Sequence, residues 1–205
     1  MTTTPFSYPA GKHVFRHGPS GYVDYESYRP WLRDEFDYRC VYCLFRERWI
    51  PVPGFHIDHL VARVMDVSKL AEYRNLLYAC PTCNSRKSSH PLPSPIEVFT
   101  ADSVTVNEDG TIEATTDDAR RLIYVLGLNS AEYNEWRRLM IDNIAYAALL
   151  KGKRGRFENL YQEWMSYPEN LPNLSQLKPP HNSRPIGIAE SAFERRLRGE
   201  LPDEY

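Results

Sequence analysis

The stretch that decides the fold runs from Cys40 to Lys87. It reads Cys40-Val41-Tyr42-Cys43, then His56-Ile57-Asp58-His59, then Asn75, and last Cys80-Pro81-Thr82-Cys83-Asn84-Ser85-Arg86-Lys87. All four cysteines of the chain stand in the two Cys-x-x-Cys pairs, with 36 residues between the pairs. A two-residue gap forms a tight turn that lets two thiolates reach one ion. We therefore expect one tetrahedral zinc ion held by Cys40, Cys43, Cys80 and Cys83.

Four thiolates would complete the shell of that zinc ion. A closed shell has no position for water, so the expected role of the zinc is structural. A redox pair and packed free thiols are the alternatives. A disulfide framework belongs to short secreted chains, whereas Met1 to Pro5 lacks the basic start and apolar core of a secretion signal. No apolar run approaches the ~18 residues that a membrane helix needs. We expect a cytoplasmic protein with no membrane partner.

The periodicity around the cysteines predicts a small strand–strand–helix unit of the α+β class. Apolar positions at helical steps predict a helix over residues 25–38. Residues 49–60 are interpreted as two short strands broken at Pro53-Gly54, and residues 61–79 as a loop followed by an apolar run. A short helix is expected to start near Asn84 and to stop before Pro91.

The rest of the chain is predicted to form an arm, a lobe and an extension. We expect an extended N-terminal arm over residues 1–24, with surface histidines at His13 and His17. The unit described above takes residues 25–92, and a β-hairpin plus a helical lobe takes residues 93–166. Residues 167–205 are rich in proline and are expected to be a loosely packed extension with a short terminal helix at 189–197.

Turn and capping signals divide the predicted lobe. Residues 103–114 alternate around Asp109-Gly110, which is a strong hairpin signal. Thr116 is a candidate cap for a helix that ends at Gly127, and Ser130 for a longer one that ends near Leu150. A further helix is expected over residues 157–166. The buried face predicted for the long helix consists of Trp136, Leu139, Met140, Ile144 and Ala147.

The charge of the chain gives weak guidance about partners. The formal net charge is -2, so a contact with phosphates would need a local patch. Residues 33–90 hold nine Lys or Arg against seven Asp or Glu, whereas residues 91–205 hold thirteen against eighteen. The basic cluster at 151–156 is open to two interpretations, a solvated helix end or a phosphate contact.

A second constellation calls for a different metal. Asp58 and Asn84 offer hard oxygen ligands, which suit magnesium or manganese. His59 has an ordinary pKa of about 6.5, so near neutral pH it can take a proton from water. Hydrolysis of a phosphodiester needs an activated water and a cation that offsets the developing charge.

These residues resemble the HNH endonucleases of the ββα-metal superfamily over residues 36–90. The resemblance implies that His59 is the general base and that Asp58 and Asn84 bind the catalytic metal. It also implies that Asn75 clasps the loop and fixes the histidine, and that Lys87 with Arg86 touches the phosphate backbone. Double-stranded DNA is the partner that it implies.

The chain also departs from that family pattern. Asn84 stands where many members have His, and Ser88 stands where nuclease colicins place a further His. An oxygen-rich site favours magnesium or manganese over a catalytic zinc or nickel. Two roles are possible for each of two further histidines. His90 is either a metal ligand or a surface residue, and His56 is either a structural strand residue or a substrate contact. Arg63 either contacts a phosphate or lies at a solvated strand end.

Three hypotheses of function follow from the sequence. The first is a metal-dependent endonuclease acting on DNA. The second is a zinc-stapled module that binds nucleic acid or protein and has lost the chemistry. The third, a tetrathiolate redox or ubiquitin-transfer finger, leaves Asp58-His59 unexplained. Residues 91–205 are expected to select substrate, to dimerise, or to dock a targeting or ATPase partner. Likeness to the family alone places such a unit in restriction, phage or anti-phage defence systems.

Overall fold

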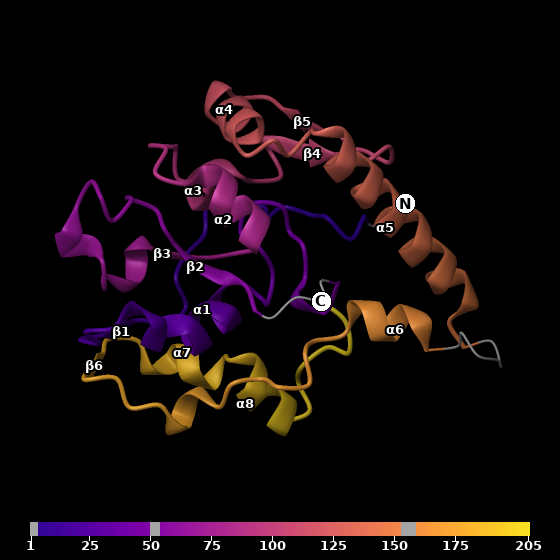
Figure 1. Cartoon of the computed structure of the whole chain (residues 1–205). Helices are drawn as coiled ribbons and strands as arrows, with labels where there is room; N and C mark the ends of the chain where they lie inside the picture. Colours follow the sequence, from indigo (N-terminus) through magenta and orange to yellow (C-terminus); the bar gives the residue numbers. More distant parts are fainter. Residues whose placement is uncertain (1–3, 50–53, 153–158) are drawn as a thin grey trace.

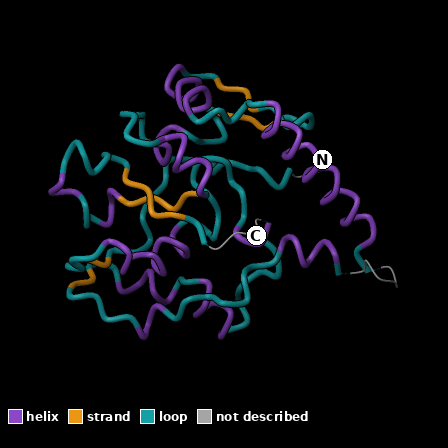
Figure 2. Tube along the Cα trace, viewed as in Figure 1, coloured by secondary structure: helices purple, strands orange, loops and turns teal. Residues whose placement is uncertain are grey.

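The computed structural model describes residues 4–49, 54–152 and 159–205. Helices and loops dominate, and the strands of the described residues form three two-stranded antiparallel sheets (Figure 2). The expected α+β class is confirmed. The HNH-like stretch lies in the middle of the molecule, with the N-terminal segment, the lobe and the C-terminal segment around it (Figure 1).

A strand pair followed by a helix forms the centre. Strand β2 (His56–His59) pairs with β3 (Leu76–Ala79), so that His56 lies opposite Ala79 and His59 opposite Leu76. Helix α2 (Pro81–Lys87) follows at once. The order is the expected strand–strand–helix, but the predicted strand boundaries were wrong, because the partner of β2 comes after it in the chain.

The sequence did not reveal β3 as the partner strand because β3 is buried on both faces. All four of its residues are buried, so its sequence shows an apolar run without the alternation that marks a half-buried strand. The first strand predicted within residues 49–60 falls partly on residues 50–53, which lie outside the described residues. Trp49 closes a short 3-10 turn instead.

Helix α2 begins earlier than expected. Cys80 is its N-cap, and the Cys80 sulfur accepts a hydrogen bond from the Cys83 amide at 3.4 Å. Pro81 then occupies the first helical position, where a missing amide hydrogen costs nothing. The helix ends at Lys87, before Pro91, as the sequence indicated.

The predicted helix over 25–38 is confirmed in a shorter form. A 3-10 turn (Tyr25–Tyr28) leads into α1 (Arg29–Glu35), whose Trp31 and Leu32 are completely buried. Helix α1 packs against β3. The helix stops because Asp37 and Tyr38 take positive φ angles of 49° and 56°.

The hairpin and helices predicted within residues 93–150 form largely as expected. After the short helix α3 (Pro95–Val98), β4 (Val104–Val106) and β5 (Ile112–Ala114) form the hairpin. Thr116 caps α4 (Asp117–Val125). Helix α5 (Ala131–Leu150) then runs along one side of the molecule (Figure 1). These three predictions are confirmed.

The buried face of α5 differs from the predicted one. Met140, Ile144 and Ala147 are buried, but Leu139 is 43 % exposed. Arg137 is fully buried, although the predicted face did not include it. A hydrophobic pattern cannot register a buried guanidinium, which here donates to the carbonyls of Gly110 and Leu128.

The N-terminal segment is extended, as predicted, but it is packed into the core. Phe6 and His17 are each 1 % exposed, and β1 (Pro19–Ser20) pairs with β6 (His181–Asn182). The predicted surface position of His17 was therefore wrong. His13 is partly buried and stacks on the ring of Phe36, with ring centroids 5.0 Å apart.

The C-terminal segment is also packed, which corrects the expected loose extension. It contains α6 (Leu160–Met165), α7 (Pro185–Ala189) and α8 (Ala192–Leu197), the last near the predicted terminal helix. Leu174 and Ala192 are buried, and α7 and α8 lie beneath α1 (Figure 1). The segment between 153 and 156 of the basic cluster lies outside the described residues, and Lys151 pairs with Glu204.

Two adjacent carboxylates at the end of α1 connect these segments. Asp34 accepts from the Ala192 amide at 2.7 Å and the Tyr38 hydroxyl at 3.1 Å, and lies 2.8 Å from the His17 ring. Burial would raise the pKa of Asp34, but the His17 ring and the Arg16 guanidinium outweigh burial and hold that pKa below its ordinary value. Asp34 thus joins both ends of the chain to α1.

Glu35 likewise connects α1 to other segments. It accepts from the backbone amides of Arg16 and His17 at 2.7 and 2.9 Å and from the Tyr73 hydroxyl at 3.1 Å. Burial opposes its ionisation, but the hydrogen bonds from His13 and from these amides lower the pKa of Glu35. Tyr73 lies in the turn just before β3, so Glu35 also positions the central sheet.

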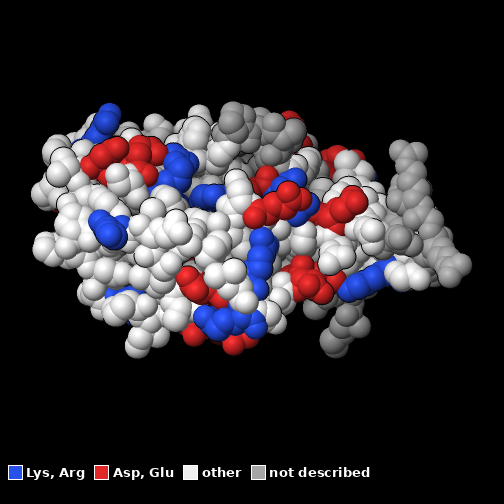
Figure 3. All heavy atoms as spheres, turned by 90° about the horizontal axis from the view of Figure 1, so that it is seen from below, with Lys and Arg blue, Asp and Glu red and all other residues white. Residues whose placement is uncertain are grey.

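Charges on the surface are mixed. On the face seen in Figure 3, Lys and Arg side chains alternate with Asp and Glu. Exposed ion pairs of the described residues include Arg138 with Glu135 and Arg198 with Glu200. Within the described residues, no helix has both the length and the apolar character needed to cross a membrane.

Removing the two buried carboxylates should destabilise the protein and flatten its acid response. Because both folded pKa values are lowered, their stabilisation is present above the unfolded value of about 4 and is lost as pH falls through the folded values. We expect Asp34→Asn/Glu35→Gln to lose roughly 3 kcal/mol or more at neutral pH. Urea unfolding between about pH 7 and pH 3 measures both effects.

The exposed Glu163→Gln on α6 is the matched control, and it should unfold as the unchanged protein does at each pH. If the double variant kept the same decline in stability towards acid, the assignment of this pH dependence to Asp34 and Glu35 would be wrong.

Candidate functional site

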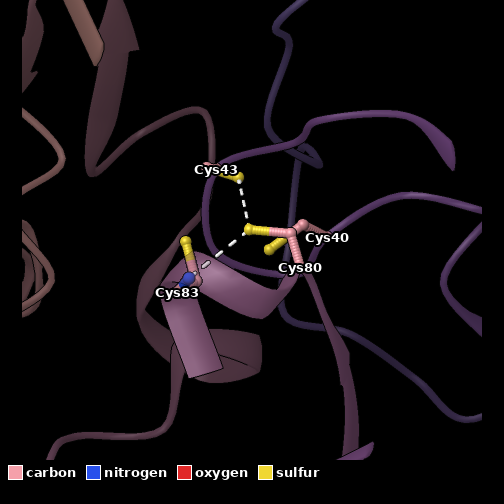
Figure 4. Close-up of side chains that lie close together, drawn as sticks. All are labelled: Cys40, Cys43, Cys80 and Cys83. Carbon is pink, nitrogen blue, oxygen red and sulfur yellow. Dashed lines mark hydrogen bonds between the residues drawn. The ribbon is translucent and has the colours of Figure 1, made fainter. Parts of the chain in front are cut away.

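Two turns bring the four cysteines together. In the first, Leu44 has a positive φ of 60° and its amide donates to the Cys40 carbonyl at 3.0 Å. The second is the start of α2, where Cys80 is the N-cap. Figure 4 shows the four sulfur atoms converging between these turns. All four side chains are buried, and their sulfurs lie within 4.8 Å of one another.

The spacing of the sulfurs fits one tetrahedral ion. Ligands about 2.3 Å from a zinc ion at tetrahedral angles lie roughly 3.8 Å apart. The sulfurs of Cys43 and Cys80 are 3.7 Å apart. The cluster is therefore compatible with a closed four-thiolate zinc site, as expected from the two pairs.

The second constellation lines a cavity of about 490 Å³ beside the sheet. Strand β2 ends at His59, so the alternation of faces ends there and both Asp58 and His59 border this cavity. The lining residues come from the 3-10 turn before α1, from β2 and the loop after it, and from α2 and the two residues that follow it: Tyr25, Ile57, Asp58, His59, Ala62, Arg63, Val64, Asn84, Lys87, Ser88 and Ser89.

His59 is held in one orientation by a backbone contact. Its Nε2 lies 3.0 Å from the carbonyl oxygen of Leu70. Because a carbonyl only accepts, Nε2 must carry the hydrogen, which leaves the lone pair on Nδ1. Burial lowers the pKa of His59, and the positive charges of Lys87 and Arg63 act in the same direction. The ring is therefore suited to accept a proton at neutral pH.

Asn75 closes the loop between the two strands. Its side-chain oxygen accepts from the Val61 amide at 2.7 Å, and its amide nitrogen donates to the carbonyls of Lys69 and Val61 at 3.0 and 3.2 Å. Lys69 precedes Leu70, whose carbonyl holds His59. Asn75 thus fixes the segment on which the orientation of His59 depends.

Asp58 and Lys87 form a buried ion pair. Lys87 Nζ lies 3.0 Å from Asp58 Oδ1 and donates to the His59 carbonyl at 2.7 Å. The Tyr42 hydroxyl donates to Asp58 Oδ2 at 2.5 Å, and burial together with Asp58 raises the pKa of Tyr42 well above its ordinary value. The Lys87 side chain is only 1 % exposed.

The two residues expected at the phosphate backbone are thus both engaged elsewhere. Lys87 neutralises Asp58 inside the protein. Arg86 donates to the carbonyls of Leu126 and Gly127 at 3.0 and 2.9 Å, which ties it to the lobe. The exposed cation that borders the cavity is Arg63. This position is compatible with both interpretations from the sequence, a phosphate contact and a solvated strand end.

Asn84 borders the same cavity from α2. Its amide nitrogen lies 3.2 Å from His56 Nδ1, so its amide oxygen is the atom left to face another partner. His56 thus contacts Asn84 and not Asp58. His90 is exposed and does not line the cavity. Tyr42 escaped the sequence analysis because it stands inside the first Cys-x-x-Cys pair, where only the cysteines carry a signal.

The comparison with protein families identified the same stretch of the chain. Residues 40–90 match the HNH endonuclease family. The resemblance found over residues 36–90 is therefore confirmed for almost all of that range, and we call residues 40–90 the HNH module. The family indicates nuclease activity, a nucleic-acid substrate and use of a divalent metal. A comparison of the chain with curated proteins gave no match.

The buried ion pair can be tested against the phosphate contact expected from sequence. Lys87→Met would leave the Asp58 carboxylate buried without its counter-charge, which costs roughly 3 kcal/mol or more. We therefore expect Lys87→Met to lower the urea midpoint strongly. Arg63→Met removes an exposed cation from the same cavity and should leave the midpoint within about 0.5 kcal/mol of the unchanged protein.

A Lys87→Met protein that unfolds like the unchanged protein but has lost affinity for a DNA duplex would contradict the ion pair and restore the phosphate contact. Titration of both variants with duplex DNA accompanies the unfolding measurement.

Proposed function

We propose that this chain is a metal-dependent HNH endonuclease that hydrolyses phosphodiester bonds of double-stranded DNA. The observation that carries the proposal is the hydrogen bond between His59 Nε2 and the Leu70 carbonyl. It leaves Nδ1 of a neutral, half-buried imidazole free to take a proton from an attacking water. Asn75 acts as the positioning residue, because it holds the loop that supplies Leu70.

Asp58 and Asn84 are the residues proposed to hold one magnesium or manganese ion. A carboxylate and an amide oxygen bordering one cavity match the ligands that these ions prefer. The bound ion would offset negative charge on the phosphate and the leaving oxygen. Both oxygens of Asp58 already accept one hydrogen bond, and each keeps a further lone pair for an ion.

The other cations of the site take distinct roles in this proposal. Lys87 orients the Asp58 carboxylate through their ion pair. It also holds the backbone of His59 by donating to the His59 carbonyl. Arg63 is the proposed phosphate contact, because it is exposed and borders the cavity. Zinc on Cys40, Cys43, Cys80 and Cys83 is proposed to be purely structural.

The proposal also covers the setting of the enzyme. A cytoplasmic place in a restriction, phage or anti-phage defence system, with a targeting or ATPase partner or a second copy of the chain, rests on the family likeness alone. Residues 91–205 are the part of the chain proposed to dock such a partner.

Cleavage of supercoiled plasmid by the purified chain tests the proposal. With magnesium or manganese, we expect nicked or linear product, and EDTA should abolish it. His59→Ala should lower the rate by ~100-fold or more, because a positioned general base contributes ~100- to 10,000-fold. His90→Ala is the matched control, since His90 is exposed and does not line the cavity, and it should cleave normally.

The zinc content and circular dichroism of each variant establish that it is folded. Equal cleavage by His59→Ala would contradict the assigned base. A folded, zinc-loaded protein that binds duplex DNA without cutting it under any of these conditions would favour the silent binding module.

A further inference from the structure

Helix α5 of the lobe reaches the cysteine cluster of the HNH module. The hydroxyl oxygen of Tyr133 lies 3.6 Å from the Cys83 sulfur and 4.0 Å from the Cys80 sulfur. Tyr133 is in the first turn of α5 and is 7 % exposed. A phenol buried this deeply needs a partner for its hydrogen, and the cysteine sulfurs are the partners that this hydroxyl has in the structure.

The ring of Tyr133 is fixed by neighbours from both parts of the chain. The Arg86 guanidinium from α2 lies 5.0 Å from the ring centroid, and that of Arg137 lies 5.8 Å from it. Phe45, next to the first cysteine pair, contacts the same ring at 5.4 Å between centroids. These contacts hold the hydroxyl against the sulfurs.

Arg137, one turn further along α5, is a buried cation among neutral partners. It is 0 % exposed and donates to the carbonyls of Gly110 and Leu128 and to the side-chain oxygen of Asn134. Its Nη1 is buried and, among the described residues, makes no hydrogen bond. A buried charge without a counter-charge is strongly unfavourable, so this guanidinium needs a nearby negative group.

A four-thiolate zinc centre would be that group. Four thiolates around a doubly charged cation carry a net charge of about -2 in a buried place, which in turn needs positive charge and hydrogen-bond donors. Burial lowers the pKa of Arg137, whereas the neighbouring Tyr8 and Cys43 act to raise it. Tyr133 connects the two groups, because its hydroxyl lies 3.6 Å from the Cys83 sulfur and its ring centroid 5.8 Å from the Arg137 guanidinium.

We propose that α5 completes the metal centre from outside: the Tyr133 hydroxyl donates a hydrogen bond to the Cys83 sulfur, and Arg137 balances the charge of the thiolates. This inference rests on the proposed structural zinc and not on nuclease activity. It makes the lobe a part of the metal site, because the ligands come from residues 40–83 whereas these two positioning residues come from residues 133–137.

The test replaces zinc by cobalt(II), whose spectrum reports on the sulfur ligands. A hydrogen bond to a thiolate lowers the energy of the sulfur lone pairs, so losing it should move the sulfur-to-cobalt charge-transfer band to longer wavelength. Tyr133→Phe keeps the ring and removes the hydroxyl. We expect a red-shifted band and an affinity for zinc about 10-fold weaker in chelator competition.

Tyr146→Phe is the matched control, since Tyr146 lies on the same helix and is 61 % exposed. Its spectrum and affinity should equal those of the unchanged protein. Arg137→Met should weaken zinc binding as well, and Arg137→Lys should restore part of the loss because it keeps the charge.

An unchanged band and unchanged zinc affinity in Tyr133→Phe would overturn the inference, whether or not the Arg137 variants fold. Failure of the unchanged protein to bind zinc or cobalt at all would overturn the structural zinc itself. Because none of these measurements involves DNA cleavage, they test this inference independently of the nuclease proposal.

Discussion

The convergence of four cysteine thiols on one point is the constraint on which the rest of the structure depends. The central sheet has only two strands of four residues each, and such a pair is not stable by itself. The cysteines join the loop after α1 to the corner between β3 and α2. That corner places Asn84 and Lys87 beside the end of β2. One bound ion would thus hold together the elements that carry the candidate catalytic residues.

Buried charged residues hold together further segments of the chain, in addition to those joined by the cysteine cluster. Asp34 and Glu35 connect α1 to the N-terminal segment, to the turn before β3 and to α8. The Asp58–Lys87 pair joins β2 to α2 inside the candidate site. Because such pairs are costly to break, they favour one arrangement of segments far apart in the sequence. The same pair also places Lys87 in the interior, which leaves Arg63 as the exposed cation that borders the cavity.

The sequence predicted the features that short-range patterns encode. The cysteine cluster, the hairpin around Asp109-Gly110 and the helices after Thr116 and Ser130 were confirmed. It failed where the environment decides: β3 is buried on both faces and shows no alternation, and His17 is buried because a carboxylate 17 residues away meets it. The buried Arg137 and the contact of Tyr42 with Asp58 depend likewise on tertiary neighbours, which no local pattern reveals.

The most direct test of this account is hydrogen–deuterium exchange, followed by mass spectrometry, on the metal-loaded protein and on the same protein after chelation. If the cysteine-bound ion holds the module and the lobe together, removing it should raise exchange in α2 and in the first turns of α5. Helix α8, which Asp34 holds, should keep more of its protection. Unchanged protection of α2 and α5 after verified loss of the metal would contradict the account.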